Sequence, residues 1–246
     1  MPKVVVLGYG GWVSDPLFGQ AGLALVTDSG RTILLDAGEG TWHWLGRCGL
    51  PRLPDAVILS HGHGDHVLGV PTLVMWASYL GRRLRIWGHP SAIKAVEGLL
   101  RATHVGESFE EVVEAHPIRA GEWVVVVEGV KVLAVEAVHP VPAYSFVLVA
   151  GGRRIAYSGD TRPNPSFIKE AKGADLLIHE VGVPAGQEAL AERFGHTSEA
   201  EICEVLERVS PRLFMPYHYF LSESRIVCEA SHEIVRPEHC LSIDLT

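Results

Sequence analysis

The chain has 246 residues, of which 47 % are hydrophobic, and its formal net charge is −8. This length suits one sizeable domain, which we expect to span residues 1–246. No apolar run approaches the ~20 residues of a membrane-spanning helix, so we expect no membrane partner. The negative charge argues against a non-specific nucleic-acid-binding surface. The N-terminus predicts a strand rather than a signal peptide, so we expect a cytoplasmic protein.

Residue usage gives two further expectations. Asn164 is the only asparagine, and Gln20 and Gln187 are the only glutamines; few amide side chains are typical of proteins from thermophiles. The four cysteines share no Cys-x-x-Cys spacing, so we expect buried thiols rather than a zinc knuckle or a disulfide framework. A bridge between Cys228 and Cys240 is the open alternative.

Apolar segments bounded by turn residues predict strands along most of the chain. These strands are expected at residues 3–7, 22–27, 32–36, 56–59, 83–87, 123–127, 130–137, 144–149, 153–157, 175–179, 212–216 and 241–245. Helical spacing predicts helices at residues 41–46, 67–80, 90–100 and 198–209, and a short helix with loops within 101–122. Two runs of strands, each followed by helices, favour two sheets packed face to face with helices outside.

Two of these helices have candidate capping residues. Thr41, or Asp36 one turn earlier, is expected to help cap the first helix. Ser198 and Glu201 have the spacing of a capping box at the start of the last one.

The most informative stretch is Ser60-His61-Gly62-His63-Gly64-Asp65-His66, which follows the predicted strand 56–59. His61 and His63 can face one metal ion, while Asp65 and His66 can face a second. Imidazole and carboxylate groups are ligands that zinc, manganese and iron accept. The alternative is a polar loop that is merely rich in histidine.

Three later strands also end in a residue that can bind metal: His139, Asp160 and His218. A rigid scaffold can position such strand-end residues. The resulting set assigns His61, His63 and His139 to one metal, Asp65, His66 and His218 to a second, and Asp160 to a bridge between them.

We therefore expect two divalent metal ions, zinc first, with manganese or iron as alternatives. A water between them would have its pKa lowered from ~15.7 toward ~7, which makes a hydroxide nucleophile. Such a cationic site favours anionic substrates.

The pattern His-x-His-x-Asp-His after a strand resembles the signature of the metallo-β-lactamase superfamily. Further stretches, in the same order along the chain, resemble its ribonuclease Z-like branch: residues 35–41, 157–163, 177–180, 195–198 and 217–220. This resemblance implies an α/β fold, the four-layer αββα sandwich, and a homodimer. No cysteine lies near a candidate ligand, which argues against β-lactam hydrolysis.

The resemblance also implies catalytic roles for His196 and Glu180, beside Asp65. His196, expected just before a helix, would contact the scissile phosphate or protonate the leaving oxygen, and Glu180 would orient it. The alternatives are a surface histidine near a helix cap and a solvated or salt-bridged glutamate.

One departure from the branch concerns the interval between His139 and Asp160. Ribonuclease Z enzymes that trim tRNA usually insert a long basic arm there, whereas a predicted hairpin fills the interval here, with only Arg153 and Arg154 basic. We therefore expect a phosphodiesterase that acts on a small or nucleotide phosphodiester, with RNA not favoured. The alternatives are tRNA 3′ processing without the arm, another metallo-hydrolase (thioesterase, lactonase or sulfatase), and a non-catalytic metal-binding scaffold.

Overall fold

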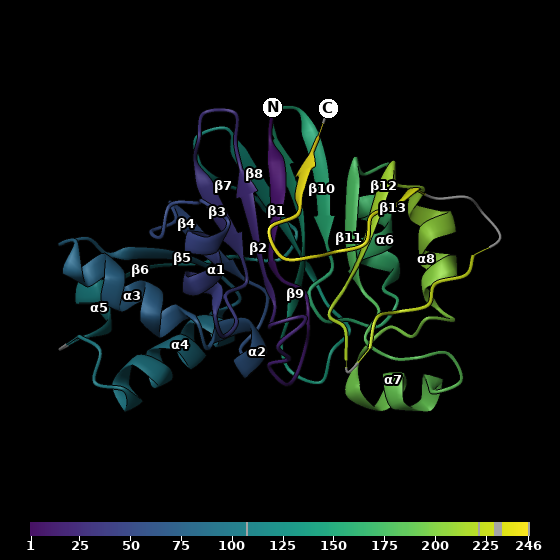
Figure 1. The fold of residues 1–246 in the computed structure, drawn as a ribbon, viewed down its shortest axis with the longest axis horizontal. Coiled ribbons are helices and arrows are strands. Elements are labelled where there is room, and N and C mark those ends of the chain that lie inside the picture. The colour runs from purple at the N-terminus through teal and green to yellow at the C-terminus, as the bar shows by residue number, and fades with distance from the viewer. Residues whose placement is uncertain (107, 221, 229–232, 246) are drawn as a thin grey trace. The chain divides into compact units, whose positions relative to one another are not determined.

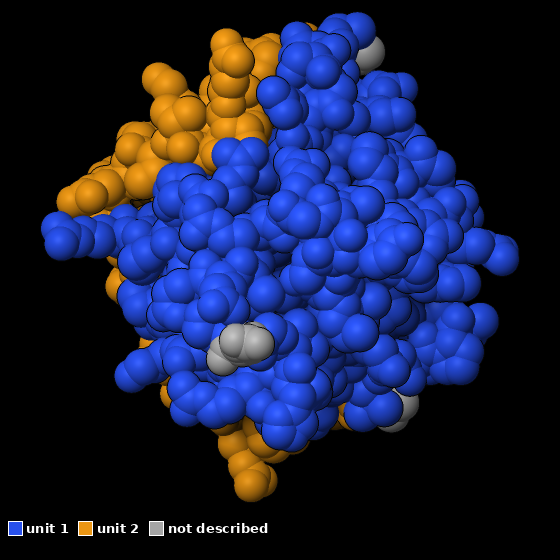
Figure 2. Space-filling model, turned by 90° about the vertical axis from the view of Figure 1, so that its left-hand side faces the viewer, with its two compact units in different colours: residues 1–119, 238–244, 246 blue, residues 120–237, 245 orange. Residues whose placement is uncertain are grey.

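The computed structural model describes residues 1–106, 108–220, 222–228 and 233–245. Figure 1 shows the helices and strands of the chain, and Figure 2 colours the two compact units into which it divides. Unit 1 comprises residues 1–119 and 238–244, and unit 2 comprises residues 120–237 and Leu245. Within the described residues, each unit holds one seven-stranded mixed sheet and its own helices.

The sheet of unit 1 has the strand order β14-β1-β2-β3-β4-β5-β6. Its strands are β1 (Lys3–Gly8), β2 (Gly22–Val26), β3 (Thr32–Leu35), β4 (Ala56–Leu59), β5 (Leu84–Gly88), β6 (Val113–Pro117) and β14 (Ser242–Asp244). Strands β14 to β3 pair antiparallel, and β3 to β6 pair parallel. The carboxyl ends of the parallel strands therefore meet at one edge of this sheet.

The sheet of unit 2 has the strand order β13-β12-β11-β10-β9-β8-β7. Its strands are β7 (Trp123–Val127), β8 (Val130–Glu136), β9 (Tyr144–Ala150), β10 (Arg153–Tyr157), β11 (Leu176–Glu180), β12 (Leu213–Tyr217) and β13 (Glu233–Ile234). Strands β7 to β10 pair antiparallel, and β10 to β13 pair parallel. Here too, the carboxyl ends of parallel strands converge.

Helices cover an apolar face of each sheet and close one core per unit. Unit 1 has α1 (Thr41–Arg47), α2 (Gly64–Val67), α3 (Val70–Tyr79), α4 (Pro90–Ala102) and α5 (Phe109–Val112); unit 2 has α6 (Pro165–Ala171), α7 (Glu188–Phe194) and α8 (Ile202–Val209). Leu73 and Val74 of α3 pack with Leu59 of β4 in unit 1. Val205 and Leu206 of α8 pack with Ala156 of β10 in unit 2. Truncating such a buried leucine to alanine costs about 2–5 kcal/mol.

None of the helices that the structure describes is long and apolar enough to cross a membrane.

Most predicted strands are present within one or two residues of the expected bounds, and the β9–β10 hairpin turns at Gly151 and Gly152 as expected. The helix predicted over residues 67–80 is instead two elements, α2 and α3, because the chain turns at Leu68 and Gly69. The sequence did not reveal β6, β13, α6 or α7. Strand β6 is half-exposed and has no apolar run, which explains why its segment resembled a loop.

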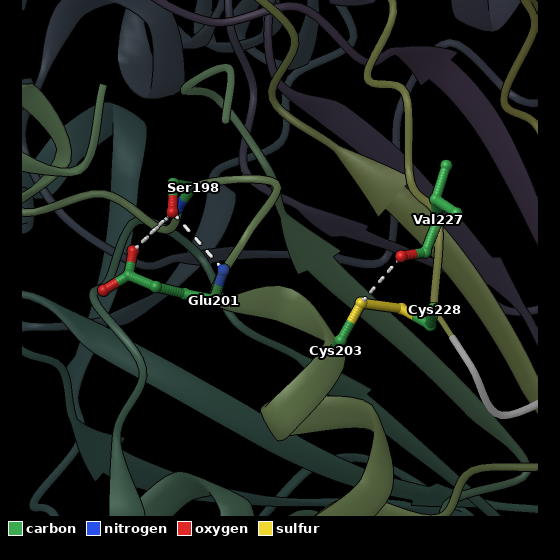
Figure 3. Close-up of a disulfide and its surroundings, with 5 residues drawn as sticks. All are labelled: Ser198, Glu201, Cys203, Val227 and Cys228. Carbon is green, nitrogen blue, oxygen red and sulfur yellow. Dashed lines mark hydrogen bonds between the residues drawn. A yellow bond between two sulfur atoms is a disulfide. The ribbon is translucent and has the colours of Figure 1, made fainter. Parts of the chain in front are cut away.

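The expected caps were only partly right. Gly40 precedes α1 with no side-chain cap, because Thr41 donates to Gly38 O and Asp36 binds elsewhere. The reciprocal bonds between Ser198 and Glu201 do form (Figure 3). They close a turn, and α8 begins only at Ile202. The helix start expected next to His196 is therefore wrong.

The prediction for the cysteines is also wrong, since all four form disulfides. Cys48, just after α1, is bonded to Cys240, and Cys203 in α8 is bonded to Cys228 (Figure 3). The alternative considered, a bridge between Cys228 and Cys240, does not form either. The first pair is separated by 192 residues, and Cα atoms 5.0 Å apart are brought together only by the fold. Both bridges fasten the C-terminal segment, one to each unit.

Candidate metal centre

Four of the predicted ligands lie together in unit 1, in the turn after β4. The rings of His61 and His63 have centroids 4.6 Å apart, and those of His61 and His66 lie 4.2 Å apart. His66 Nε2 lies 3.5 Å from Asp65 Oδ2. All but His63 are buried. A strand end followed by one helical turn, α2, therefore gathers three imidazoles and one carboxylate.

Asp36, at the end of β3, orients two of these histidines. Its carboxylate accepts hydrogen bonds from Ser60 N and Ser60 Oγ, both at 2.7 Å, and from His66 Nδ1 at 2.8 Å. Ser60 Oγ in turn lies 3.0 Å from His61 Nδ1. With Nδ1 of both rings facing this network, Nε2 is the nitrogen that each ring presents to a metal. Such outer partners fix the tautomer of histidine ligands.

Asp65 also has a backbone partner. Trp12, in the loop between β1 and β2, donates its N–H to Asp65 Oδ2 at 2.7 Å. Gln20, at the end of that loop, donates to Trp12 O at 3.5 Å and accepts from Glu39 N at 2.8 Å. The β1–β2 loop is thereby tied to the metal-binding turn.

The remaining predicted residues lie in unit 2, four of them at or just after strand ends and His196 in the loop after α7. Asp160 follows β10, Glu180 ends β11 and His218 follows β12, and these three strands are parallel. His218 Nε2 lies 3.3 Å from Asp160 Oδ2. His139 follows β8, and its ring centroid lies 5.4 Å from that of His196. All five predicted residues of unit 2 are thus brought to one edge of its sheet.

Glu180 and His196 form a buried pair. Glu180 Oε1 lies 3.0 Å from His196 Nδ1, and the side chains are 0 % and 5 % exposed. Two backbone groups also donate to this carboxylate: Thr161 N at 2.7 Å and Thr197 N at 3.2 Å. Three donors on one buried carboxylate hold it in a single orientation. The imidazole of His196 consequently presents Nε2 away from Glu180.

Thr161 links the segments that carry these groups. Its hydroxyl donates to Arg162 O at 2.8 Å and accepts from Val138 N at 2.9 Å, next to His139. Its carbonyl accepts from Thr197 Oγ1 at 2.7 Å, next to His196. A single buried threonine therefore ties the His139, Asp160 and His196 segments together.

His139 is held by the loop that also carries His196. Its Nδ1 lies 3.1 Å from Gly195 O, and burial lowers the pKa of His139 from its ordinary value, against the opposing effect of Asp160. A lowered pKa keeps the imidazole in the neutral form that binds metals. Gly195 has φ 73, and a Cβ there would lie 2.4 Å from Pro140 Cδ, so only glycine fits.

The sequence did not identify the supporting residues Asp36, Ser60, Thr161 and Thr197. All four lie within stretches that the sequence analysis singled out, but none was given this role; Asp36 was considered only as a helix cap. Their roles depend on hydrogen bonds to residues 19 to 36 positions away, which periodicity does not reveal.

The donor sets fit divalent metal ions. Each unit presents buried imidazole nitrogens beside a carboxylate, and in both units Nδ1 of a histidine is held by a hydrogen-bond acceptor. Imidazole together with carboxylate is a ligand set of zinc, manganese and iron.

Comparison with known proteins places the chain in a family. A family model described as "Beta-lactamase superfamily domain" matches residues 31–219, well over half of the chain. The chain belongs to the β-lactamase superfamily. The match runs from β3 of unit 1 to the residue after His218 in unit 2, so it includes every predicted site residue.

Individual superfamily members resemble the chain over most of its length. Ribonuclease Z from Methanothermobacter thermautotrophicus is 27 % identical, with 83 % of each chain covered. The metallo-β-lactamase fold protein YhfI from Bacillus subtilis has a TM-score of 0.83 at 20 % identity, covering 99 % of this chain and 100 % of that one. Human tRNase Z, short form, has a TM-score of 0.82 at 22 % identity, covering 99 % of both.

These comparisons confirm the ribonuclease Z-like resemblance and the α/β metallo-β-lactamase fold. They also confirm the class of metal-dependent hydrolase. They do not support the preference against RNA, because the curated relative is a ribonuclease.

Proposed function

We propose that this protein is a dinuclear metal phosphodiesterase that cleaves a small or nucleotide phosphodiester. The observation that carries the proposal is the buried pair of Glu180 and His196 in a chain of this superfamily. A histidine whose Nδ1 faces a buried carboxylate is suited to act as a general acid through Nε2.

We propose the predicted ligand assignment for the metals. His61, His63 and His139 would hold one ion, Asp65, His66 and His218 would hold the other, and Asp160 would contribute to both. Zinc is the proposed metal, since it accepts this mixture of imidazole and carboxylate in four-coordinate sites. When bound, the two ions supply positive charge for the phosphodiester and lower the pKa of a water molecule.

The residues of the chain then have distinct roles in the reaction. Asp65 takes up the proton of the attacking water. Its Oδ2 also accepts a hydrogen bond from the backbone N–H of Trp12. His196 Nε2 donates a proton to the leaving oxygen as the P–O bond breaks. Glu180 keeps His196 oriented and stabilises its charged form. Together they leave one phosphomonoester and one alcohol.

The shortness of the interval between His139 and Asp160 favours a small substrate. In the structure this interval contains only the end of a loop and the β9–β10 hairpin. It holds no extra segment that could grip a large RNA. A second candidate, tRNA 3′ processing without the arm, is favoured by the curated relative named Ribonuclease Z.

Several further properties complete the proposal. The two units act as one hydrolase domain of residues 1–246, consistent with a family match that includes parts of both. The chain forms a homodimer, as the family resemblance implies. It resides in the cytoplasm of a thermophile. Disulfides are rare in cytosolic proteins of mesophiles but common in those of hyperthermophiles, so a cytoplasmic location with these two bridges favours a thermophilic source.

Hydrolysis of two substrates by the zinc-loaded protein tests the proposal. Bis(p-nitrophenyl) phosphate is compared with a precursor tRNA that carries a 3′ trailer, and His196→Ala and Asp65→Ala serve as controls. We expect turnover of the small diester, lost in both variants. Trailer removal at comparable efficiency would favour the second candidate. Cleavage of a thioester or lactone with neither phosphodiester touched would contradict both.

A further inference from the structure

The segment that carries His196 is flanked by two glutamates that bind the same arginine. Arg162 Nη1 donates to Glu192 Oε1, and Arg162 Nη2 donates to Glu201 Oε1, both at 3.3 Å. Glu192 lies in α7 and precedes His196 in the chain, whereas Glu201 follows it in the turn before α8. The two ends of one guanidinium therefore bind the chain on both sides of the proposed general acid.

The backbone of Arg162 is itself fixed next to two proposed metal ligands. Arg162 N donates to Val138 O at 3.0 Å, beside His139. Its carbonyl accepts the hydroxyl of Thr161, which follows Asp160 in the chain. The guanidinium therefore reaches the His196 segment from a braced starting point.

Glu201 connects the guanidinium to the buried pair. While Oε1 of Glu201 binds Arg162, its Oε2 accepts from Ser198 N at 3.0 Å and from Ser198 Oγ at 2.9 Å (Figure 3). The preceding residue, Thr197, donates its N–H to Glu180 Oε2 at 3.2 Å. One path of hydrogen bonds, interrupted by a single peptide bond, therefore runs from Arg162 to the carboxylate that orients His196.

Stability alone does not explain this arginine. The side chains of Arg162 and Glu192 are 32 % and 72 % exposed, and ion pairs this open to solvent contribute little to folding. Arg162 Nε is buried and has no hydrogen-bond partner among the residues that the structure describes. An unpaired buried donor is unfavourable for the folded state. The position therefore keeps an arginine whose benefit lies in what its two ends hold.

We propose that Arg162 is a positioning residue that keeps His196 aimed at the leaving oxygen and acts mainly through Glu201. This inference rests on the proposed function, in which His196 is the general acid. A general acid must lie within hydrogen-bond reach of the atom it protonates, so a small displacement slows the proton transfer. Glu201 is the main partner because its side chain is only 23 % exposed and also binds Ser198.

Two phosphodiesters with different leaving groups test the inference on the zinc-loaded protein. These are methyl phenyl phosphate and methyl p-nitrophenyl phosphate. Phenolate is much more basic than p-nitrophenolate, so its departure depends more on a general acid. Arg162→Ala should lower kcat by roughly 10–100-fold for the phenyl ester and by about threefold at most for the p-nitrophenyl ester. Its zinc content should equal that of the wild type.

Substitutions of the two glutamates identify the partner through which Arg162 acts. Glu201→Gln keeps an oxygen for Ser198 but turns an amide toward Arg162, so it should reproduce the leaving-group dependence of Arg162→Ala. The double variant should be no slower than either single one, because both remove the same contact. Glu192→Gln should have little effect. Arg162→Lys, which keeps the charge without the forked geometry, should restore part of the loss.

The matched control is Arg153→Ala. Arg153 also lies in unit 2, is 36 % exposed, and binds Asp175 Oδ1 at 3.0 Å. Its ion pair is therefore comparable with those of Arg162 but involves none of the proposed site residues. This variant should leave kcat unchanged for both esters.

Amide hydrogen exchange of the metal-free protein separates this inference from the proposed function, since it needs no turnover. The N–H groups of residues 196–198 are all hydrogen-bonded within unit 2. Arg162→Ala should speed their exchange by roughly tenfold, and Arg153→Ala should not. If the wild type hydrolyses neither ester but shows this exchange pattern, the proposed function fails and the hold of Arg162 on the His196 segment stands. Unchanged exchange, an equal loss of kcat for both esters, or a loss of bound zinc in Arg162→Ala would overturn the inference.

Discussion

The carboxylate of Glu180 lies 3.0 Å from Nδ1 of His196, and both side chains are buried in unit 2. Neither residue is one of the seven proposed metal ligands. The pair therefore allows the acid–base chemistry to be separated experimentally from metal binding.

His196→Ala should lower kcat by about 10²–10⁴-fold, because it removes the proposed general acid. Its metal content should equal that of the wild type. Glu180→Gln should lower kcat less, since Gln can keep an oxygen for Thr161 N and His196 Nδ1, although Thr197 N loses its acceptor. Steady-state kinetics with metal analysis checks this. A parallel loss of metal and activity would instead make His196 part of the metal site.

Asp36→Asn should weaken metal binding by about 10–100-fold. The variant keeps an oxygen for Ser60 N but turns an amide toward His66 Nδ1, which disfavours the tautomer that presents Nε2. Asparagine tolerates the left-handed backbone at this position, φ 56, so the fold should survive. Competition with a chelator gives the affinity. Asp55→Asn, which removes a carboxylate that binds Arg31 and Thr32, is the matched control and should leave metal affinity unchanged.

Thr161→Val should destabilise the protein by about 1–3 kcal/mol, because Val138 N loses its acceptor inside the protein. It should also lower kcat, since the segments of His139 and His196 are no longer held together. Thr161→Ser keeps the hydroxyl and should restore both properties. Chemical denaturation and kinetics of the two variants check this. Full activity in a destabilised Thr161→Val would show that the hydroxyl serves only folding.

Acid should destabilise the metal-free protein partly through His179. Burial lowers the pKa of His179 in the folded state, against the opposing effect of its bond to Glu180 O. The unfolded chain has a histidine pKa of about 6.5. It therefore binds a proton at a pH where the imidazole of the folded chain is still neutral. The stability contribution is present above pH ~6.5 and is lost as pH falls toward the folded pKa, at up to about 1.4 kcal/mol per pH unit.

The measurement is the free energy of unfolding between pH 7 and pH 5 for three metal-free proteins. His179→Asn, whose amide can still donate to Glu180 O, should show a shallower pH dependence than the wild type. His104→Asn removes an exposed histidine and should keep the wild-type slope. Identical slopes in all three proteins would mean that His179 does not contribute.

The double substitution Cys203→Ala/Cys228→Ala should lower the free energy of unfolding by about 2–4 kcal/mol. The bridge closes a 25-residue separation and holds the segment after His218 against α8. Reducing agent should lower the stability of the wild type and leave that of a variant lacking all four cysteines unchanged. The prediction would be contradicted if reductant, added while the wild type is unfolded, left its free energy of unfolding unchanged.

The sequence was informative where chemistry is local and uninformative where it depends on the fold. His61 to His66 lie within six residues, so one turn could be read directly, and strand-end positions marked His139, Asp160 and His218. Glu180 and His196 were reached only through the family resemblance. Their hydrogen bond joins residues 16 positions apart and depends on the loop after α7, which Thr197 binds to Glu180 and to Thr161.

The missed features share one physical origin. Disulfide partners, the orienting role of Asp36 and the links made by Thr161 are contacts between segments distant in sequence. The edge strand β6 is half-exposed, so it lacks the alternating or continuous apolar pattern that marks buried strands. In each case tertiary structure, rather than local preference, determines the outcome.

The most direct test of the central claim is a metal titration followed by hydrolysis. The metal-free protein receives increasing zinc, and bis(p-nitrophenyl) phosphate turnover is measured at each ratio. We expect activity that rises to a plateau at two ions per chain, and one ion fewer bound by Asp65→Ala. A protein that binds two ions yet cleaves no phosphodiester, or that reaches full activity without metal, would contradict it.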